Sequence, residues 1–196
     1  MNDHTVGHRM YQQPWPDGEY CFFQMGYLVD DLIGAAATWA RVFGIGPFHV
    51  LPVAEQTGVR HGEQSAITVQ VAAAQAGPLQ VELIQQHCDR PSIFRDWHRG
   101  RVSGLHQLCT PTNDYEATKQ HYTGLGYDLA FESNNGRFRV AYYDTAADFG
   151  FITEVVEQTP RVLEQVAVVS RTCAEWDGSD PVRLLTRDGY RTPSDG

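Results

Sequence analysis

The chain has 196 residues, with 24 acidic against 15 basic side chains, which gives a formal net charge of -9. Such a charge repels a phosphate backbone and excludes nucleic acid as the main partner. With 42% hydrophobic and 20% charged residues, the composition is that of a soluble protein able to bury a full core. No run approaches the roughly 18 apolar residues that span a bilayer, and the polar start is unlike a signal peptide. We therefore expect a cytoplasmic protein with no membrane partner.

The four cysteines are widely separated along the chain and form no Cys-x-x-Cys pair. This spacing favours neither a zinc ribbon nor a redox motif, so reduced structural thiols are the simplest interpretation.

The chain begins with residues 1–19, whose prolines and mixed polar residues predict an extended N-terminal arm. Residues 20–29 are rich in aromatic and aliphatic side chains and predict a strand. Asp30 or Asp31 can then cap a helix that ends at Gly44. A strand and a capped helix thus open the first module.

Three further strands complete this module. We expect one over 46–53, then a polar loop that contains Gly58, His61, Gly62 and Glu63, a strand over 65–73, and a turn into a strand over 80–86. The predicted module is therefore β-α-β-β-β and spans residues 20–100, including a connector with a short helix that begins at residue 87.

The same pattern restarts at Gly104 and predicts a second module over 101–160. A strand over 105–110 leads to Asn113 or Asp114, either of which can cap a helix. The remaining predicted elements are a helix over 115–122, a strand over 127–132, a hairpin turn at 134–136, and strands over 137–144 and 151–158. The chain thus contains two copies of one supersecondary unit.

Residues 161–196 are predicted to form a C-terminal helix and an irregular tail. After Pro160, apolar residues recur at spacings of four and three; they are Val162, Val166, Val169, Cys173 and Trp176. This stripe could cover the outside of the sheet or pair with a second subunit. Because the stripe and the exposed sheet edges both need cover, we expect a homodimer.

Each module closes on a strand with an acid at its centre, Glu82 in the first and Glu154 in the second. Alternation in a strand points both carboxylates where an apolar side chain is expected. A buried carboxylate needs a compensating partner, and a metal ion can hold several.

Each module also opens on a polar residue in a strand, Gln24 in the first and His106 in the second. Both lie 20 residues before a glycine, Gly44 and Gly126 respectively. Taken singly, such a histidine is more often a hydrogen-bonded core residue, and such a glutamine a solvated amide. As a repeated set, Gln24, Glu82, His106 and Glu154 predict a metal site.

Four stretches of the chain resemble the vicinal oxygen chelate superfamily, which contains glyoxalase I, methylmalonyl-CoA epimerase, extradiol dioxygenases and the bleomycin resistance proteins. They are Gln24 to Leu32, Val81 to Ile84, Gly104 to His106 and Ile152 to Val156. The resemblance covers roughly residues 20–160 and implies an α+β fold of paired β-α-β-β-β modules. These modules would form a half-barrel around one metal, with ligands from their first and last strands.

Gln24 stands where most members of that superfamily have histidine, although the zinc form of glyoxalase I also uses a Gln, Glu, His, Glu set. One nitrogen and three oxygen ligands suit zinc, manganese, cobalt, nickel or magnesium. Only one histidine falls in a ligand slot, which disfavours an extradiol dioxygenase.

Such a site suggests chemistry in which a metal polarises a carbonyl and stabilises an enolate while a carboxylate moves the α-proton. Glu154 and Glu63 are the candidate bases. Glu63 resembles the loop-to-strand glutamate of acyl-CoA epimerases, but a solvated loop acid explains it equally well.

Several other side chains are candidates for substrate binding. The aromatic candidates are Tyr27, Phe48, Tyr142 and Tyr143, and the cationic ones are Arg137 and Arg139. A packed core and a solvated hairpin are the ordinary explanations for the two groups.

These inferences predict a metal-dependent isomerase, epimerase or lyase that acts on a small carbonyl compound or acyl thioester. The alternative is a sequestering protein for a hydrophobic small molecule, as in the bleomycin resistance members. A structural or interaction role is a third possibility, suggested by the C-terminal helix.

Overall fold

The computed structural model describes residues 21–97 and 103–193, so the predicted arm over 1–19 lies outside the described residues. The first module follows the expected order, with one strand more than predicted. Its elements are β1 (Gln24–Leu28), α1 (Leu32–Phe43), β2 (Phe48–Val50), β3 (Ala54–Arg60), β4 (Glu63–Ala76) and β5 (Leu79–Gln86).

The short helix α2 (Ile93–Trp97) connects the modules. The second module consists of β6 (Gly104–Thr112), α3 (Tyr115–Gly124), β7 (Leu129–Asn134), β8 (Arg139–Tyr143), α4 (Ala146–Phe149) and β9 (Ile152–Glu157). The chain continues with α5 (Pro160–Ala174), β10 (Val182–Thr186) and β11 (Gly189–Arg191).

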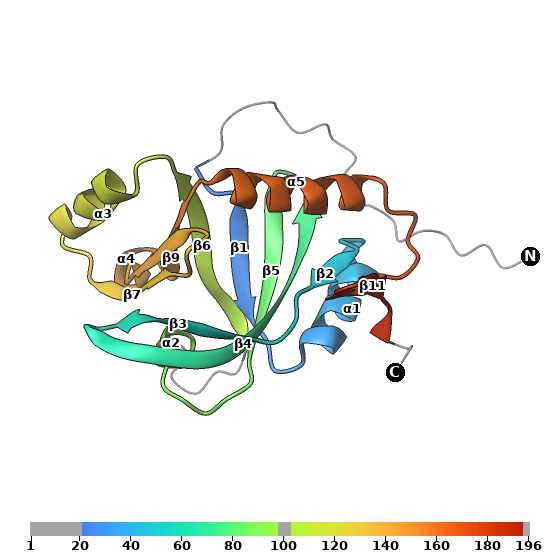
Figure 1. The fold of residues 1–196 in the computed structure, drawn as a ribbon, viewed down its shortest axis with the longest axis horizontal. Helices are drawn as coiled ribbons and strands as arrows, with labels where there is room; N and C mark the ends of the chain where they lie inside the picture. Colours follow the sequence, from blue (N-terminus) through green and yellow to red (C-terminus); the bar gives the residue numbers. More distant parts are fainter. Residues whose placement is uncertain (1–20, 98–102, 194–196) are drawn as a thin grey trace, which may run out of the picture.

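Eight of the described strands form a closed ring in the order β4, β3, β7, β8, β9, β6, β1 and β5, because β5 pairs again with β4. The two modules meet along β1 and β6 on one side of the ring (Figure 1). On the other side only the ends of β3 and β7 pair, Val59 with Glu132 and Arg60 with Phe131. The predicted α+β fold is therefore confirmed, with the modules joined by one long and one short seam.

The two long helices inside the modules begin in the same way. Asp31 accepts a hydrogen bond from the backbone of Gly34, and Asp114 accepts one from Ala117, so each aspartate is an N-cap. Gly44 ends α1 in the left-handed conformation that glycine tolerates best. In each predicted pair of candidate caps, Asp30 or Asp31 and Asn113 or Asp114, the second residue is therefore the N-cap.

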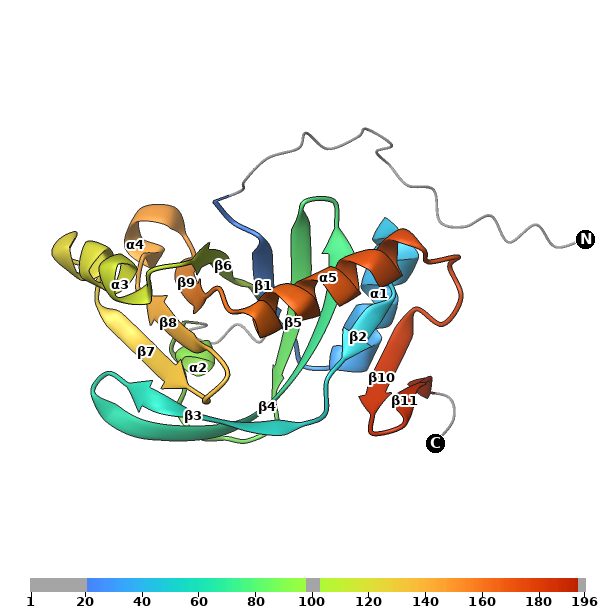
Figure 2. The ribbon, with the colours of Figure 1, turned by 45° about the horizontal axis from the view of Figure 1, so that its top comes forward.

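The C-terminal helix α5 crosses β1, β5 and β4 close to the turn between β4 and β5 (Figures 1 and 2). Thr159 caps it and Pro160 occupies its first turn, where the missing N–H is not needed. Val169 and Cys173 of the predicted stripe are buried against the sheet. The stripe is therefore covered, in part, within the chain itself. Among the described residues, no helix combines the length and the apolar character needed to cross a membrane.

Apolar side chains fill both faces of the ring. The cluster on the enclosed face draws on strands of both modules and on α2; its buried members are Leu28, Ile67, Ile84, Ile93, Phe94, Ala130, Phe131, Val140, Tyr142 and Ile152. Outside the ring, α1 and α5 cover the first module and α3 covers the second. Residues that alternate with the enclosed cluster along a strand therefore belong to the outer face.

Two expectations were wrong. The polar loop predicted between the strands at 46–53 and 65–73 consists mostly of β3, whose backbone pairs with β4 from Ala54 to Arg60 without an apolar pattern of its own. The predicted irregular tail contains β10 and β11; β10 pairs with β2, and Val182 is buried in the core. Local hydrophobicity does not reveal these three strands, because β3 is mostly polar and β10 depends on pairing with the distant strand β2.

Candidate functional site

Polar side chains from four strands meet on the enclosed face of the ring. Gly26 lies opposite Glu82 in the parallel pair of β1 with β5, and opposite Gln107 in the antiparallel pair of β1 with β6. Cross-strand partners point to the same face of a sheet. Since Gly26 has no side chain, Glu82 and Gln107 approach each other across it.

A second row runs beside the first. Gln24 pairs with Cys109, Cys109 with Glu154, and Glu154 with Tyr142. Register alone therefore brings these four side chains onto one face, next to Glu82 and Gln107. Gln24 also donates to Oε1 of Gln80 at 3.5 Å.

The Gln107 amide lies between the two carboxyl groups. Its Nε2 is 3.5 Å from Glu82 Oε2 and 3.4 Å from Glu154 Oε2. The Tyr142 hydroxyl donates to the other oxygen of Glu154, Oε1, at 3.0 Å. The side chains of Glu154 and Gln107 are almost fully buried. The two acids thus share one polarised donor in the interior of the protein.

Burial raises the pKa of both acids. For Glu82, burial and the nearby charge of Glu154 raise the pKa to about 8. Burial also raises the pKa of Glu154, but hydrogen bonds from Tyr142, Cys109 and Gln107 favour its carboxylate and act in the opposite direction. Glu82 is therefore the member of the pair that holds a proton near neutral pH.

His106 reaches the same region by a different route. Between Gly26 and Tyr27 the register with β6 shifts by one residue, and His106 is the extra residue of this β-bulge. Its Nε2 donates to the backbone carbonyl of Ile93 at 3.2 Å, and its Nδ1 contacts Oε1 of Gln107. The imidazole therefore lies behind Gln107, on the side away from the acids.

The donor set fits an oxygen-seeking cation. Among the described residues, no three or more His, Cys, Asp or Glu side chains gather in a way that could hold a metal ion. Two acids with raised pKa values, Glu154 buried and Glu82 partly buried, nevertheless converge on one nitrogen, which marks a point where positive charge is stabilised. The carboxylates and the amide oxygens of Gln24 and Gln107 are the ligand types that hard divalent ions prefer.

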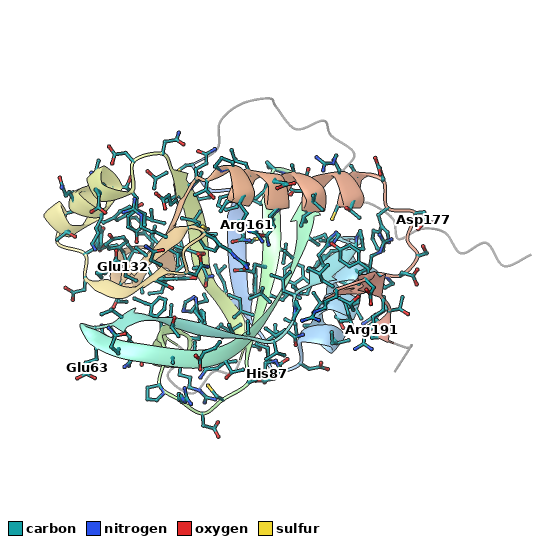
Figure 3. All side chains as sticks on the ribbon, in the orientation of Figure 1. Glu63, His87, Glu132, Arg161, Asp177 and Arg191 are labelled. Carbon is teal, nitrogen blue, oxygen red and sulfur yellow. The ribbon has the colours of Figure 1, made fainter. Side chains whose placement is uncertain are left out.

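The second candidate base lies far from this pair. Glu63 is exposed at the turn between β3 and β4, where it pairs with Arg60 across the hairpin. Figure 3 shows its side chain beyond the tip of this hairpin, directed away from the ring.

Of the aromatic candidates, the structure places Tyr142 alone beside the acid pair. Tyr27 lies on the outer face against Trp39 of α1, with ring centroids 5.0 Å apart, and Phe48 is buried in the same outer cluster. Tyr143 stacks on Tyr122 of α3 at 4.7 Å. Adjacent residues in a strand point to opposite faces of the sheet, so Tyr142 faces the enclosed side and Tyr143 the outer side.

The two arginines also lie away from the acids. Arg139 is on the outer face, where it bonds Glu157 at 2.8 Å and Glu116 at 2.6 Å. Arg137 is exposed in the turn before β8.

Sequence reasoning missed Gln107, although one signal identifies it. Gln24 precedes the N-cap Asp31 by seven residues, and Gln107 precedes the N-cap Asp114 by seven. Aligning the two modules on their caps therefore places Gln107, and not its neighbour His106, opposite Gln24. Alignment on the later glycines hides this relation because α1 has 12 residues and ends at the C-cap Gly44, whereas α3 has 10 residues and Gly126 lies beyond its C-cap Leu125.

Comparison with known proteins assigns the chain to a family. The model of the Glyoxalase/Bleomycin resistance protein/Dioxygenase superfamily matches residues 23–142, and the chain belongs to this superfamily. The resemblance to the vicinal oxygen chelate proteins is thereby confirmed. No curated protein matches the chain in sequence.

Solved structures agree with this fold. Methylmalonyl-CoA epimerase from Mycobacterium tuberculosis is 20% identical, with a TM-score of 0.51 over 73% of this chain and 91% of that one. A hypothetical protein from Bacillus halodurans C-125 is 14% identical, with a TM-score of 0.50 over 70% and 94% of the two chains. At these identities the similarity concerns the fold.

Proposed function

We propose that the protein is a divalent-metal-dependent isomerase or epimerase that moves the proton on the carbon next to a carbonyl group. Its substrate would be a small carbonyl compound or an acyl thioester, and a lyase reaction through the same enolate-like intermediate is the variant to test beside it. The observation that supports this most directly is the pairing of the buried Glu154 with the partly buried Glu82 on either side of the Gln107 amide, with the pKa of Glu82 raised to about 8. Carboxyl groups tuned in this way are typical of acid-base catalysis near neutral pH.

The proposed ligands are Gln24, Glu82, Gln107 and Glu154. This set replaces His106 with Gln107, because the amide of Gln107 and not the imidazole faces the two acids. All four then offer oxygen, which favours magnesium or manganese over zinc, nickel or cobalt. When bound, the cation would supply the positive charge that stabilises an enolate oxygen.

Glu154 is the proposed base. Its two oxygens have different partners, since Oε2 faces Gln107 and Oε1 accepts from Tyr142. Hydrogen bonds to the carboxylate favour its ionised form, while Glu82 retains its proton more readily. Epimerisation requires that a proton leave one face of the carbon and that a proton return to the opposite face, and two acids with separated proton affinities can divide these two steps.

The test combines elemental analysis with α-proton exchange in deuterated buffer, followed by proton NMR on a panel of ketones and acyl thioesters. Glu154→Gln is expected to slow exchange by about 10²-fold or more, the usual contribution of a positioned base. Glu63→Gln separates the two candidate bases, and Glu175→Gln, an exposed acid after α5, is the matched control.

Wild type should contain up to one equivalent of metal after incubation with magnesium or manganese. Full exchange by Glu154→Gln together with loss in Glu63→Gln would transfer the catalytic role to the hairpin tip. Absence of exchange on every substrate, with no bound cation, would remove the proposal.

The apolar character of the enclosed face favours a second candidate, a protein that sequesters a hydrophobic molecule. Phe94, Phe131 and Tyr142 gather there among aliphatic side chains. Binding of an apolar fluorescent probe should then survive metal removal and the Glu154→Gln substitution. Enzymatic function instead predicts that metal removal stops proton exchange and that Glu154→Gln slows it by about 10²-fold or more.

A further inference from the structure

His106 is a buried histidine to which the proposed reaction assigns no role. Its side chain is fully buried, and its position in the bulge of β6 directs it toward the enclosed face. Bulges commonly re-aim one side chain next to a functional site. The neighbouring residue in the chain is Gln107, whose amide lies between the two acids.

The ring of His106 is held on several sides. The Ile93 carbonyl of α2 is 3.2 Å from Nε2, and the ring of Phe94 lies edge-on with its centroid at 5.1 Å. The ring of Tyr142, which also binds Glu154, has its centroid at 6.4 Å. These contacts leave the imidazole one orientation, with Nδ1 against the amide of Gln107.

The hydrogen-bond partners of this ring determine which amide atom suits it. A carbonyl oxygen only accepts, so Nε2 of His106 carries the ring hydrogen that points to Ile93. In a neutral ring Nδ1 is then an acceptor, and its complementary partner is the NH₂ group of Gln107. A half-turn of the amide exchanges its nitrogen and oxygen without moving another atom.

We propose that His106 is a positioning residue that holds the carbonyl oxygen of Gln107 toward Glu82 and Glu154 when a divalent cation is bound. An amide binds a cation through oxygen, so the turned orientation is the one a ligand requires. The inference rests on the proposed function, since it assumes a cation at the acid pair. It explains why a histidine, with an acceptor and a donor on one rigid ring, lies between Ile93 and Gln107.

Calorimetric titration of metal-stripped protein with manganese tests this role without any substrate. His106→Leu removes the acceptor and should weaken manganese binding by about 10- to 100-fold, as loss of such partners usually does. His106→Asn places an amide oxygen near the former Nδ1 and should stay within about 3-fold of wild type. His121→Leu, at an exposed position on α3, is the matched control.

A double-mutant cycle with Gln107→Ala separates positioning from general structural damage. If His106 acts through Gln107, His106→Leu should cause no further loss of affinity once Gln107 is alanine. An equal loss in both backgrounds would overturn the inference. If His106→Leu fails to fold, His106→Gln takes its place in the comparison. This side chain can still reach the Ile93 carbonyl but not the Gln107 amide, so it should bind manganese as weakly as expected for His106→Leu.

The outcomes also distinguish this inference from the proposed function. If wild type binds manganese and His106→Leu binds it equally well, His106 has no positioning role and the metal site stands. If wild type binds neither manganese nor magnesium, the proposed function fails and this inference fails with it.

Discussion

At the residue scale, the two acids conflict with each other and with their surroundings. Glu82 and Glu154 lie on one enclosed face, where burial and like charge disfavour a second negative charge. A proton on Glu82 relieves this cost, and a divalent cation would relieve more of it. Proton and metal binding should therefore compete at this site.

The first prediction concerns the pH dependence of stability in metal-stripped protein. The pKa of Glu82 is about 8 in the folded chain against an ordinary value of 4.5, so the folded state binds more protons between these values. The contribution of this protonation to the free energy of unfolding should be fully present below about pH 4.5 and should be lost as the pH rises through about 8. Glu82→Gln should flatten this fall and raise the free energy of unfolding at pH 9 by on the order of 2 kcal/mol.

Urea unfolding at pH 5, 7 and 9 checks this, with Glu175→Gln as the exposed control. Parallel pH profiles for wild type and Glu82→Gln would show that the pKa of Glu82 is not raised.

The second prediction concerns Gly26, which makes room for the Gln107 amide. A Cβ added at Gly26 would lie 2.5 Å from Cδ of Gln107, so that flexible side chain would have to move. Gly26→Ala should therefore weaken manganese binding about 10-fold or more while changing the melting temperature by only a few degrees. Calorimetry and thermal unfolding of the same sample measure both effects, and unchanged affinity would exclude Gln107 as a ligand.

At the element scale, the short seam between β3 and β7 depends on a close approach of two backbones. A Cβ at Gly58 would lie 2.5 Å from Cζ of Phe131 and would also meet the backbone carbonyl of Glu132. Phe131 belongs to the cluster on the enclosed face, so the seam and the interior are coupled. The backbone at Glu132 cannot move aside for an added Cβ as a flexible side chain could.

The third prediction follows from this contact. Gly58→Ala should destabilise the fold by about 1–3 kcal/mol, the usual cost of overpacking. Gly124→Ala is the matched control, because a Cβ there would meet nothing within 4 Å and the helix end tolerates alanine. Equal unfolding midpoints for the two variants in urea would contradict the proposed role of the seam.

At the scale of the whole molecule, the expected reasons for dimerisation are weaker than the sequence suggested. Closure of the ring gives each of its eight strands a paired neighbour on both sides, although β3 and β7 pair only at Val59 and Arg60, and α5 buries Val169 and Cys173 against the sheet. The exposed apolar residues that remain include Val42 and Phe43 at the end of α1.

The fourth prediction is that the protein forms a homodimer, for which the exposed apolar residues Val42 and Phe43 at the end of α1 are a candidate interface. Light scattering after size exclusion should give twice the chain mass of 22.0 kDa. A mass of one chain at about 50 μM would exclude it, and in a dimer Phe43→Glu should shift the mass toward one chain if α1 forms the interface.

The repeated module was visible in the sequence because its signals are local. Asp31, Asp114 and Gly44 mark helix ends through bonds to residues three or four positions away. Glu82 and Glu154 stood out because an acid interrupts an apolar strand. Strand β3, by contrast, is polar and exists through its pairing with β4.

The sequence by itself determined the repeated module, the caps of its two helices, the superfamily and the two acids, because their signals are local; it did not reveal β3, β10 or β11. The tertiary structure alone decided which side chains meet. Gln107 joins the acids, His106 stands behind it, and Tyr142 faces inward while Tyr143 faces out. The physical reason is that cross-strand register and one bulge fix side-chain direction, and a shift of one residue reverses it.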